Sequence, residues 1–202
     1  MKKLLIATSN KGKFREYTQL LAGLPYDLMS LQDVRIKGEI EESYDNYREN
    51  ALHKAVTCAG LSGLMTLADD SGIEVDALEG EPGVRSARYA GDDASDALRV
   101  AYLLDKIRDV TWEKRTCRFV CFIAVALEPG KTEVFRGQCD GYVAFEPRGE
   151  NGFGYDPVFY FPKLDKTMAE LGTDVKNRIS HRAIAAQQAY KMLESLTEKA
   201  EI

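Results

Sequence analysis

The sequence has few of the residues that build disulfide scaffolds, metal clusters or membrane spans. It holds four cysteines and two histidines in 202 residues, and no two cysteines form a Cys-x-x-Cys pair. We therefore expect reduced core thiols rather than disulfides or zinc ligands. The apolar stretch Leu4–Ala7 is too short for a signal peptide, and no apolar run is long enough to cross a bilayer. These absences predict a cytoplasmic protein without membrane contact.

Positive charge is also not in excess. The chain carries 27 Lys and Arg against 32 Asp and Glu, a net charge of -5. This argues against a general nucleic-acid binder, which usually carries a basic stripe. It leaves room for a small anionic ligand, because such a ligand needs only a local cluster of donors and cations. The length and the 45% hydrophobic content fit one large globular domain, 1–202, or two small lobes sharing a core.

Helical and extended patterns alternate along the chain. Strands are expected at 2–7, 64–68, 73–78, 117–127, 133–145 and 157–161. Helices are expected at 14–21, 44–59 and 183–196, and another that begins at Asp93 or Ser95 and runs to about Ile107. Ser43 and Thr173 are the expected N-caps of two helices. The turn at Glu128–Lys131 predicts a hairpin between two long strands. An antiparallel hairpin among interleaved helices and strands predicts an α/β fold with a mixed sheet.

The segment Thr8–Lys13 lies between a predicted strand and a predicted helix. A helix N-terminus offers backbone N–H groups and partial positive charge, and Gly12 lets the backbone approach an anion closely. Lys11 and Lys13 add formal charge, which suits a triphosphate. The Walker A spacing is absent. The alternative is a polar turn with exposed lysines.

Two adjacent carboxylates follow an apolar strand in Asp69-Asp70-Ser71-Gly72. Side chains alternate along an extended chain, so one carboxylate can face a cleft while the other supports the loop. Magnesium prefers oxygen ligands and combines carboxylates with substrate phosphates. Further carboxylates lie at Glu39, Glu41, Glu42 and Glu49. The alternative is an acidic turn with solvated surface charges nearby.

Three other segments carry residues suited to a nucleotide. Glycines flank aromatic residues in Asn151–Pro157, which favours a platform for a flat base or, equally, packing anchors. Lys176 could meet phosphate, and Ser180-His181-Arg182 holds donors for a base carbonyl, although a histidine near a helix start is often a packing residue. Arg85 and Arg88 follow a Pro-Gly turn and could contact phosphate, a partner chain or solvent.

Taken together, these segments resemble the inosine/xanthosine triphosphate pyrophosphatase family, the house-cleaning enzymes for non-canonical purine nucleotides. In order, they are Ser9–Lys13, Glu49-Asn50-Ala51, Ala68–Gly72, Pro82-Gly83-Val84, Ser86–Tyr89, Gly152–Pro157 and Ser180-His181-Arg182. They cover nearly the whole chain in the same order and at similar spacing. Ser9 replaces a glycine that is frequent in the family. Before Glu49-Asn50-Ala51, the family's Thr-Phe is replaced by Asn46-Tyr47, with Arg48 intervening. This leaves open how the helix predicted at 44–59 packs.

The resemblance implies an elongated two-lobed α/β fold around a long, twisted mixed sheet, with a nucleotide cleft between the lobes. It implies a homodimer. It also implies a nucleoside triphosphate pyrophosphohydrolase that uses Mg²⁺ to convert ITP, dITP and XTP to the monophosphate and pyrophosphate, which removes them from the nucleotide pool.

The resemblance also assigns roles to residues. Asp70 matches the catalytic proton acceptor and metal ligand, and Glu41 best matches a second metal ligand, with Glu42 adjacent. Thr8–Lys13 match the phosphate-binding loop, and Phe153–Asp156 match the base-binding loop. Residues matched to substrate contacts are Thr8, Ser9, Asn10, Lys11, Gly12, Lys13, Ser71, Phe153, Gly154, Tyr155, Asp156, Lys176, His181 and Arg182.

A mechanism follows as a hypothesis. Asp70 would orient or deprotonate a water that attacks the α-phosphorus, while lysines of the matched segments offset the phosphate charge. A 6-keto purine would present an acceptor to donors of His181 or Arg182, where adenine presents a donor. Three rival functions stay open: a pyrophosphatase for pyrimidine or modified nucleotides, a nucleotide-binding regulator without turnover, and a structural or interaction domain.

Overall fold

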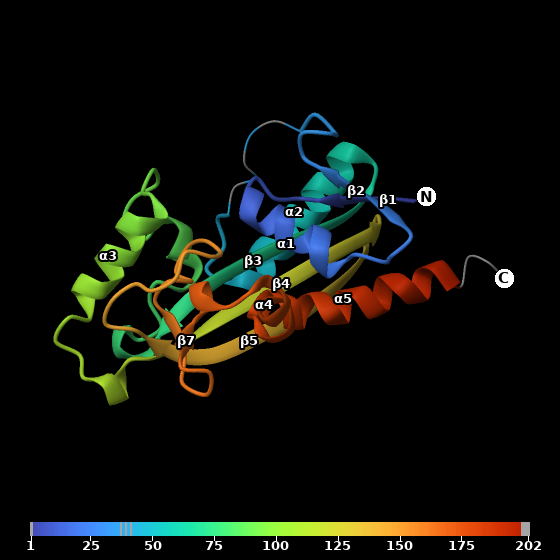
Figure 1. The fold of residues 1–202 in the computed structure, drawn as a ribbon. Helices are drawn as coiled ribbons and strands as arrows, with labels where there is room; N and C mark the ends of the chain where they lie inside the picture. Colours follow the sequence, from blue (N-terminus) through green and yellow to red (C-terminus); the bar gives the residue numbers. More distant parts are fainter. Residues whose placement is uncertain (1, 37, 39, 41, 199–202) are drawn as a thin grey trace. The chain divides into compact units, whose positions relative to one another are not determined.

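The computed structural model describes residues 2–36, 38, 40 and 42–198 (Figure 1). In this part of the chain, a seven-stranded sheet has the order β2-β1-β3-β4-β5-β6-β7. Strand β1 pairs in parallel with β2 and β3, whereas β6 pairs antiparallel with β5 and β7. The predicted α/β fold with a mixed sheet is therefore confirmed.

The strands are β1 (Lys2–Ile6), β2 (Tyr26–Ser30), β3 (Met65–Val75), β4 (Thr116–Glu128), β5 (Lys131–Val143), β6 (Phe159–Phe161) and β7 (Lys166–Thr167). The α-helices are α1 (Lys11–Leu20), α2 (Tyr47–Ser62), α3 (Asp96–Lys106), α4 (Thr173–Ile179) and α5 (His181–Glu198). Short 3₁₀ turns are η1 (Asp76–Leu78), η2 (Gly83–Arg88), η3 (Trp112–Lys114) and η4 (Met168–Glu170).

The chain divides into two compact units. Unit 1 consists of Met1–Asp70, Cys121–Gly137 and Arg182–Ile202, and unit 2 consists of Ser71–Val120 and Gln138–His181. The chain passes between the units inside β3, β4 and β5 and at the start of α5.

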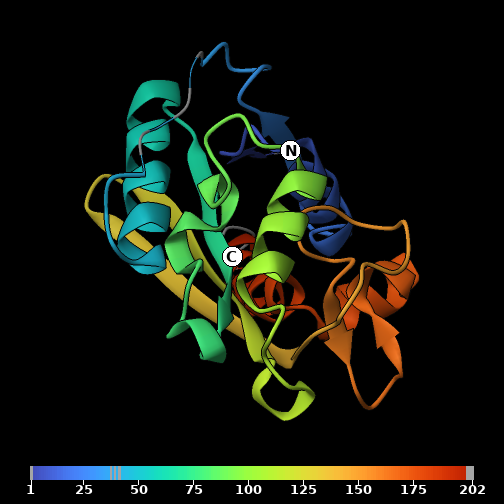
Figure 2. The same ribbon diagram turned by 90° about the vertical axis from the view of Figure 1, so that its left-hand side faces the viewer.

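In unit 1, helices cover both faces of the strands. Helices α1 and α5 lie on one face and α2 lies on the other (Figure 2). The core between α2 and the strands is built mainly of small side chains from both sides: Ala7, Ala51, Ala55, Cys58, Ala68, Ala124 and Ala126. Small side chains let a helix approach the strands closely. Polar side chains of α2 can therefore reach Asp70 in the middle of β3.

Unit 2 has its own apolar core. Val100 and Leu103 of α3 pack with Ile73 and Val75 at the end of β3. Tyr155 from the loop before β6 joins the same cluster. This loop is therefore attached to a folded core and not only to its neighbours in sequence.

Several element boundaries differ from the predictions. β3 is one strand through Asp69–Gly72, where the sequence predicted a turn between two strands. Helix α1 begins at Lys11, three residues earlier than predicted. Asn46, not Ser43, caps α2, and its side chain accepts a hydrogen bond from the Glu49 amide at 2.9 Å.

Further elements were partly or wholly missed. Strand β2 was not predicted, because most of its side chains are only partly buried and it lacks a clear apolar pattern. The N-cap of α4 is Gly172 and not Thr173, which is the first residue of the helix. The helix expected near 95–107 is confirmed as α3, with Ser95 accepting a hydrogen bond from the Leu98 amide at 3.2 Å.

Candidate active site

Two consecutive carboxylates of β3 lie in different environments of unit 1. Asp69 and Asp70 are buried, with only 1% and 4% of their surface exposed. Asp69 contacts residues of α1 and α5, whereas Asp70 contacts α2. Side chains alternate along a strand, so neighbouring residues point to opposite faces. The opposite orientation predicted from the sequence is confirmed.

Asp70 accepts a hydrogen bond from Asn50 Nδ2 at 3.0 Å. Burial and the negative charge of Glu42 together raise the pKa of Asp70 to about 6, against the opposing effect of Lys54 and Lys13. Lys54 is ion-paired with Glu42. A carboxyl group with a pKa near neutrality, fixed by an amide, is suited to accepting a proton from water.

Asp69 is held by two cations. Lys13 Nζ lies 3.0 Å and Arg182 Nε lies 3.6 Å from Asp69 Oδ2. Burial alone would raise the pKa of Asp69, but the charges of Lys13 and Arg182 lower it well below its usual range. Asp69 is therefore a permanent negative charge that ties α1 and α5 to β3.

The predicted phosphate-binding loop folds around the start of α1. Asn10 Oδ1 accepts a hydrogen bond from the Lys13 amide at 3.0 Å, and Thr8 Oγ1 accepts one from the Asn10 amide at 3.2 Å. The first amides of a helix have no intrahelical acceptor, so those of Lys11 and Gly12 are suited to an anion. The side chains of Ser9 and Lys11 are exposed.

In unit 2, the predicted base-binding loop is organised by one carboxylate. Asp156 Oδ2 accepts hydrogen bonds from the Phe153 amide at 2.9 Å and from Lys176 Nζ at 2.5 Å. Lys176 Nζ also lies 5.1 Å from the centre of the Phe153 ring. A Cβ on Gly152 would lie 1.9 Å from Asp156 Oδ2, and its φ is +81°, so only glycine fits there.

The end of the loop is anchored elsewhere in unit 2. The Tyr155 hydroxyl donates a hydrogen bond to the Ser86 carbonyl at 2.9 Å. Ser86 Oγ in turn accepts one from the Ile73 amide at 2.9 Å. Ser71, a predicted substrate contact, is half-buried two residues earlier in β3.

His181 and Arg182 begin α5 and are both buried. The His181 ring stacks on Phe119, with 4.6 Å between ring centres. Arg182 Nη1 lies 2.7 Å from Glu16 Oε2, in addition to its contact with Asp69. Its guanidinium therefore braces carboxylates within unit 1. The prediction that Arg182 contacts substrate stays a prediction.

The predicted site residues fall into two groups. Thr8–Lys13, Asp70 and Arg182 belong to unit 1, and Ser71, Phe153–Asp156, Lys176 and His181 belong to unit 2. The predicted metal ligand Glu41 lies outside the described residues, as does Glu39. Among the described residues, no three His, Cys, Asp or Glu side chains are grouped to hold a metal ion.

Sequence reasoning gave no role to two residues beside Asp70. Asn50 lies in the Glu-Asn-Ala segment that carried the family resemblance, so the segment was noticed without a function for its amide. Lys54 follows Asn50 by four residues, which places both on the same face of α2. That spacing was the available signal, but only the tertiary structure shows that this face meets Asp70.

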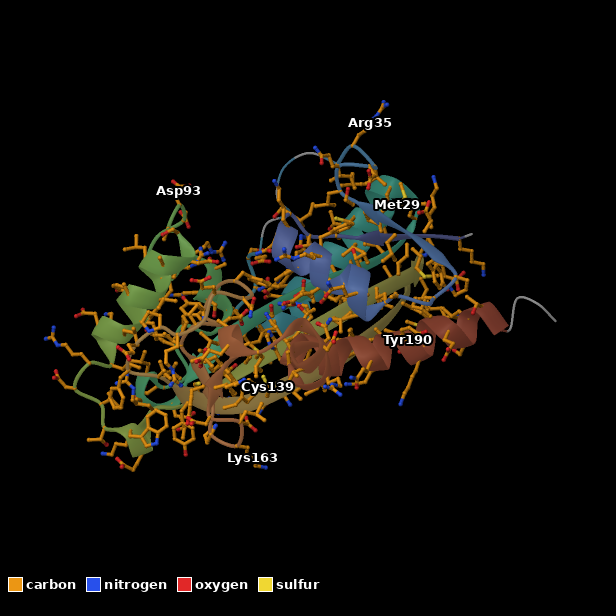
Figure 3. All side chains as sticks on the ribbon, in the orientation of Figure 1. Met29, Arg35, Asp93, Cys139, Lys163 and Tyr190 are labelled. Atoms are coloured by element: carbon orange, nitrogen blue, oxygen red, sulfur yellow. The ribbon has the colours of Figure 1, made fainter. Side chains whose placement is uncertain are left out.

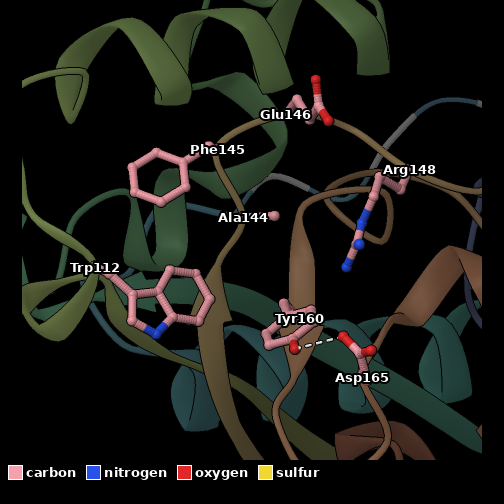
Figure 4. A pocket seen from close by; sticks show the side chains of 7 residues that line it. All are labelled: Trp112, Ala144, Phe145, Glu146, Arg148, Tyr160 and Asp165. Atoms are coloured by element: carbon pink, nitrogen blue, oxygen red, sulfur yellow. Dashed lines mark hydrogen bonds between the residues drawn. The ribbon is translucent and has the colours of Figure 1, made fainter.

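A separate pocket of about 230 Å³ lies in unit 2 (Figure 4). Its lining residues are Trp112, Ala144, Phe145, Glu146, Arg148, Tyr160 and Asp165. The Tyr160 hydroxyl donates to Asp165 Oδ1 at 2.8 Å. None of the predicted site residues lines this pocket, so it does not enter the candidate site.

In the described part of the chain, no helix has the length and apolar character needed to cross a membrane.

Known proteins resemble this chain over nearly its full length. The sequence profile of the Ham1 family matches residues 4–192. A dITP/XTP pyrophosphatase of Bacillus subtilis (strain 168) is 45% identical over 195 residues, covering 96% of this chain and 98% of the relative. A solved HAM1 protein from Coxiella burnetii is 38% identical, with a TM-score of 0.88 over 96% of this chain and 100% of that one. The Staphylococcus aureus Ham1 protein is 40% identical, with a TM-score of 0.85 over 96% and 99%.

Proposed function

We propose, because this chain belongs to the Ham1 family, that it hydrolyses dITP, XTP and ITP to the nucleoside monophosphate and pyrophosphate. The observation that carries the proposal is Asp70, a buried carboxyl group in the same unit as the Thr8–Lys13 segment. Its pKa of about 6 lets it exchange a proton with water near neutral pH.

The residues around Asp70 fit a magnesium ion. Asp70 and Glu42 are oxygen donors of the kind magnesium prefers, and their charges interact. Two carboxylates are typical of a site that substrate phosphates complete. Asp70 and Glu42 would hold the ion. Glu42 would then take the ligand role that the family resemblance gave to the neighbouring Glu41. When bound, magnesium would offset negative charge on the phosphates.

Asp70 supplies the acid–base chemistry of the proposed reaction. Its carboxylate orients a water toward the α-phosphorus and accepts the proton as the new P–O bond forms and the bond to the β-phosphate oxygen breaks. Asn50 holds the carboxylate in place through its 3.0 Å hydrogen bond. Positioning of this kind supplies much of the rate in phosphoryl chemistry.

The triphosphate is assigned to the start of α1. The helix dipole and the first-turn amides of Lys11 and Gly12 attract an anion, and the exposed Lys11 side chain adds a full charge. Lys13 faces Asp69 in this structure, so its charge is already partly balanced. Its effect on phosphate binding is therefore expected to be smaller than that of Lys11.

The purine base is assigned to residues of unit 2. The Phe153 ring offers a flat surface for stacking, and Asp156 and Lys176 fix its backbone and surroundings. His181 supplies a ring N–H that can donate to a 6-keto oxygen. Adenine would place its amino donor against that donor, and an unpaired buried polar group separates substrates by about 10⁴.

The test is pyrophosphate release from dITP, XTP, ITP, GTP, ATP and dTTP, with magnesium and with EDTA. The three non-canonical purine nucleotides should be turned over with the highest kcat/KM, and EDTA should abolish release. Comparable kcat/KM values for ATP and ITP would contradict the base assignment. A thermal shift with dITP but no release from any nucleotide would instead favour a binding protein without turnover.

The active form is proposed to be a homodimer, as the family resemblance implies. Light scattering across a range of protein concentrations should give a mass near twice that of the 22.6 kDa chain. A monomer mass in a fully active sample would contradict this part of the proposal and leave the hydrolysis intact.

A further inference from the structure

The base-binding loop is held at its centre by a residue outside every motif identified in the sequence. The Gly154 amide donates a hydrogen bond to Asp96 Oδ2 at 2.7 Å. Asp96 is the first residue of α3, 58 positions earlier in the chain. Its other oxygen, Oδ1, is paired with Arg99.

Three hydrogen bonds close a ring between α3, η2 and the loop. Asp96 accepts from the Gly154 amide, the Tyr155 hydroxyl donates to the Ser86 carbonyl at 2.9 Å, and Arg99 Nη1 donates to the Ala87 carbonyl at 2.6 Å. Ser86 and Ala87 are consecutive, and so are Gly154 and Tyr155. The ring therefore fixes two neighbouring residues of the loop against two neighbouring residues of η2.

The loop needs this support because its own sequence leaves it flexible. Gly152 and Gly154 adopt positive φ angles of +81° and +62°. Glycine loses more conformational freedom on ordering than other residues, so outside contacts must offset that cost. Asp156 anchors the end of the loop and the Phe153 amide. Asp96 supplies the acceptor for the amide of Gly154, which lies between Phe153 and Tyr155.

We propose that Asp96 is a positioning residue that sets the selectivity of the base-binding loop, an inference that rests on the proposed function. It contacts no reacting atom and acts through the Gly154 amide. Without it, the Phe153 ring has more freedom and the site discriminates less between purines. The reaction at Asp70 belongs to unit 1 and is left in place.

A simpler role for Asp96 would be its favourable charge at the N-terminus of α3. The two roles differ in what Asp96→Asn does. An asparagine loses the charge but keeps an oxygen acceptor for the Gly154 amide, so it should keep selectivity. Asp96→Ala loses both. Asp93→Ala is the matched control, because Asp93 is an exposed acid that projects outward from the segment before α3 (Figure 3).

The experiment measures kcat and KM for dITP and dATP with the wild-type chain and these three variants. Asp96→Ala should raise KM for dITP about tenfold, change kcat less than about threefold, and lower the dITP-to-dATP ratio of kcat/KM about tenfold. Asp96→Asn and Asp93→Ala should stay near the wild type. A selectivity ratio for Asp96→Ala equal to that of Asp93→Ala would overturn the proposal.

Hydrogen exchange gives a readout that does not need activity. The amide of Gly154, followed in peptides covering residues 151–158, should exchange about tenfold faster in Asp96→Ala and not in Asp93→Ala. Unchanged exchange would overturn the inference even if the chain proves to be no pyrophosphatase. If Asp96→Ala does not fold, Asp96→Leu serves instead, because leucine fills a similar volume and also gives the Gly154 amide no acceptor; its selectivity ratio must then fall.

Discussion

Asp69 and Asp70 are consecutive in β3, yet Asp69 pairs with Lys13 at 3.0 Å while Asp70 accepts a hydrogen bond from Asn50 at 3.0 Å on the opposite face of the strand. Their pKa values shift in opposite directions for this reason. Cations lower the pKa of Asp69, whereas burial raises that of Asp70 to about 6. One carboxylate is thus structural and the other is available for chemistry.

Replacing Asp70 by asparagine should stop catalysis without unfolding the chain. Asparagine keeps the shape and a hydrogen-bond acceptor for Asn50 but cannot accept a proton from water. We expect kcat for dITP to fall at least about a hundredfold, roughly 3 kcal/mol in the barrier. Steady-state pyrophosphate release measures this, with the melting temperature as a check of folding. Near-normal turnover would remove Asp70 from the catalytic role.

Replacing Asp69 by asparagine should instead destabilise the fold. The change leaves Lys13 and Arg182 beside a neutral group, and removing one member of a buried ion pair costs about 3 kcal/mol or more. Urea unfolding followed by circular dichroism should show this loss. The matched control is Asp27→Asn on the exposed side of β2. Equal unfolding midpoints for the two variants would show that Asp69 does not brace the structure.

Metal dependence can separate the candidate carboxylates. Glu42→Gln should raise the magnesium concentration for half-maximal activity about tenfold or more, because a ligand is lost. Glu49→Gln should have no effect, since Glu49 is exposed at the start of α2. Glu41→Gln is the decisive comparison. A large shift for Glu41→Gln with none for Glu42→Gln would return the ligand role to Glu41.

The buried thiols predict how stability changes at alkaline pH. Burial raises the pKa of Cys121 and Cys139 to about 12, whereas the pKa of a thiol in the unfolded chain is ~8.5. Above pH ~8.5 the unfolded chain loses these protons first, so the stability present below that pH is lost as the pH rises.

The measurement is the urea midpoint between pH 7.5 and 10 for the wild type and Cys121→Ala. The midpoint of the wild type should fall with pH, and that of the variant should fall less steeply. In parallel, iodoacetamide at pH 8 should modify the four buried cysteines of the folded chain slowly. In urea, where the chain is unfolded, it should modify all four rapidly. Parallel pH slopes and rapid alkylation of the folded chain would contradict the buried, protonated thiols.

Local patterns predicted much of the fold because several elements carry their own signals. The apolar stretch of β1 and the Ser95 cap of α3 are examples. The sequence Asp69–Gly72 was misleading, since acidic and glycine residues are typical of turns. It remains extended because Lys13, Arg182 and Asn50 balance the two carboxylates. These partners come from distant segments that local patterns do not connect.

The site was predicted as a set of residue types but not as a set of contacts. The sequence predicted Arg182 as a substrate contact but gave no sign of its ion pairs with Glu16 and Asp69. The sequence analysis gave Asp96 no role, and nothing in its neighbourhood pointed to Gly154. Contacts of this kind depend on how α3 and the loop pack on the core of unit 2, which is a tertiary property.

The position of water attack tests the central claim most directly. Hydrolysis of dITP in ¹⁸O-labelled water, followed by mass spectrometry of both products, shows which phosphorus receives the oxygen. Attack at the α-phosphorus, with Asp70 as the proton acceptor, places the label in the monophosphate and leaves pyrophosphate unlabelled. Label in pyrophosphate, or release of inorganic phosphate in place of pyrophosphate, would contradict the account.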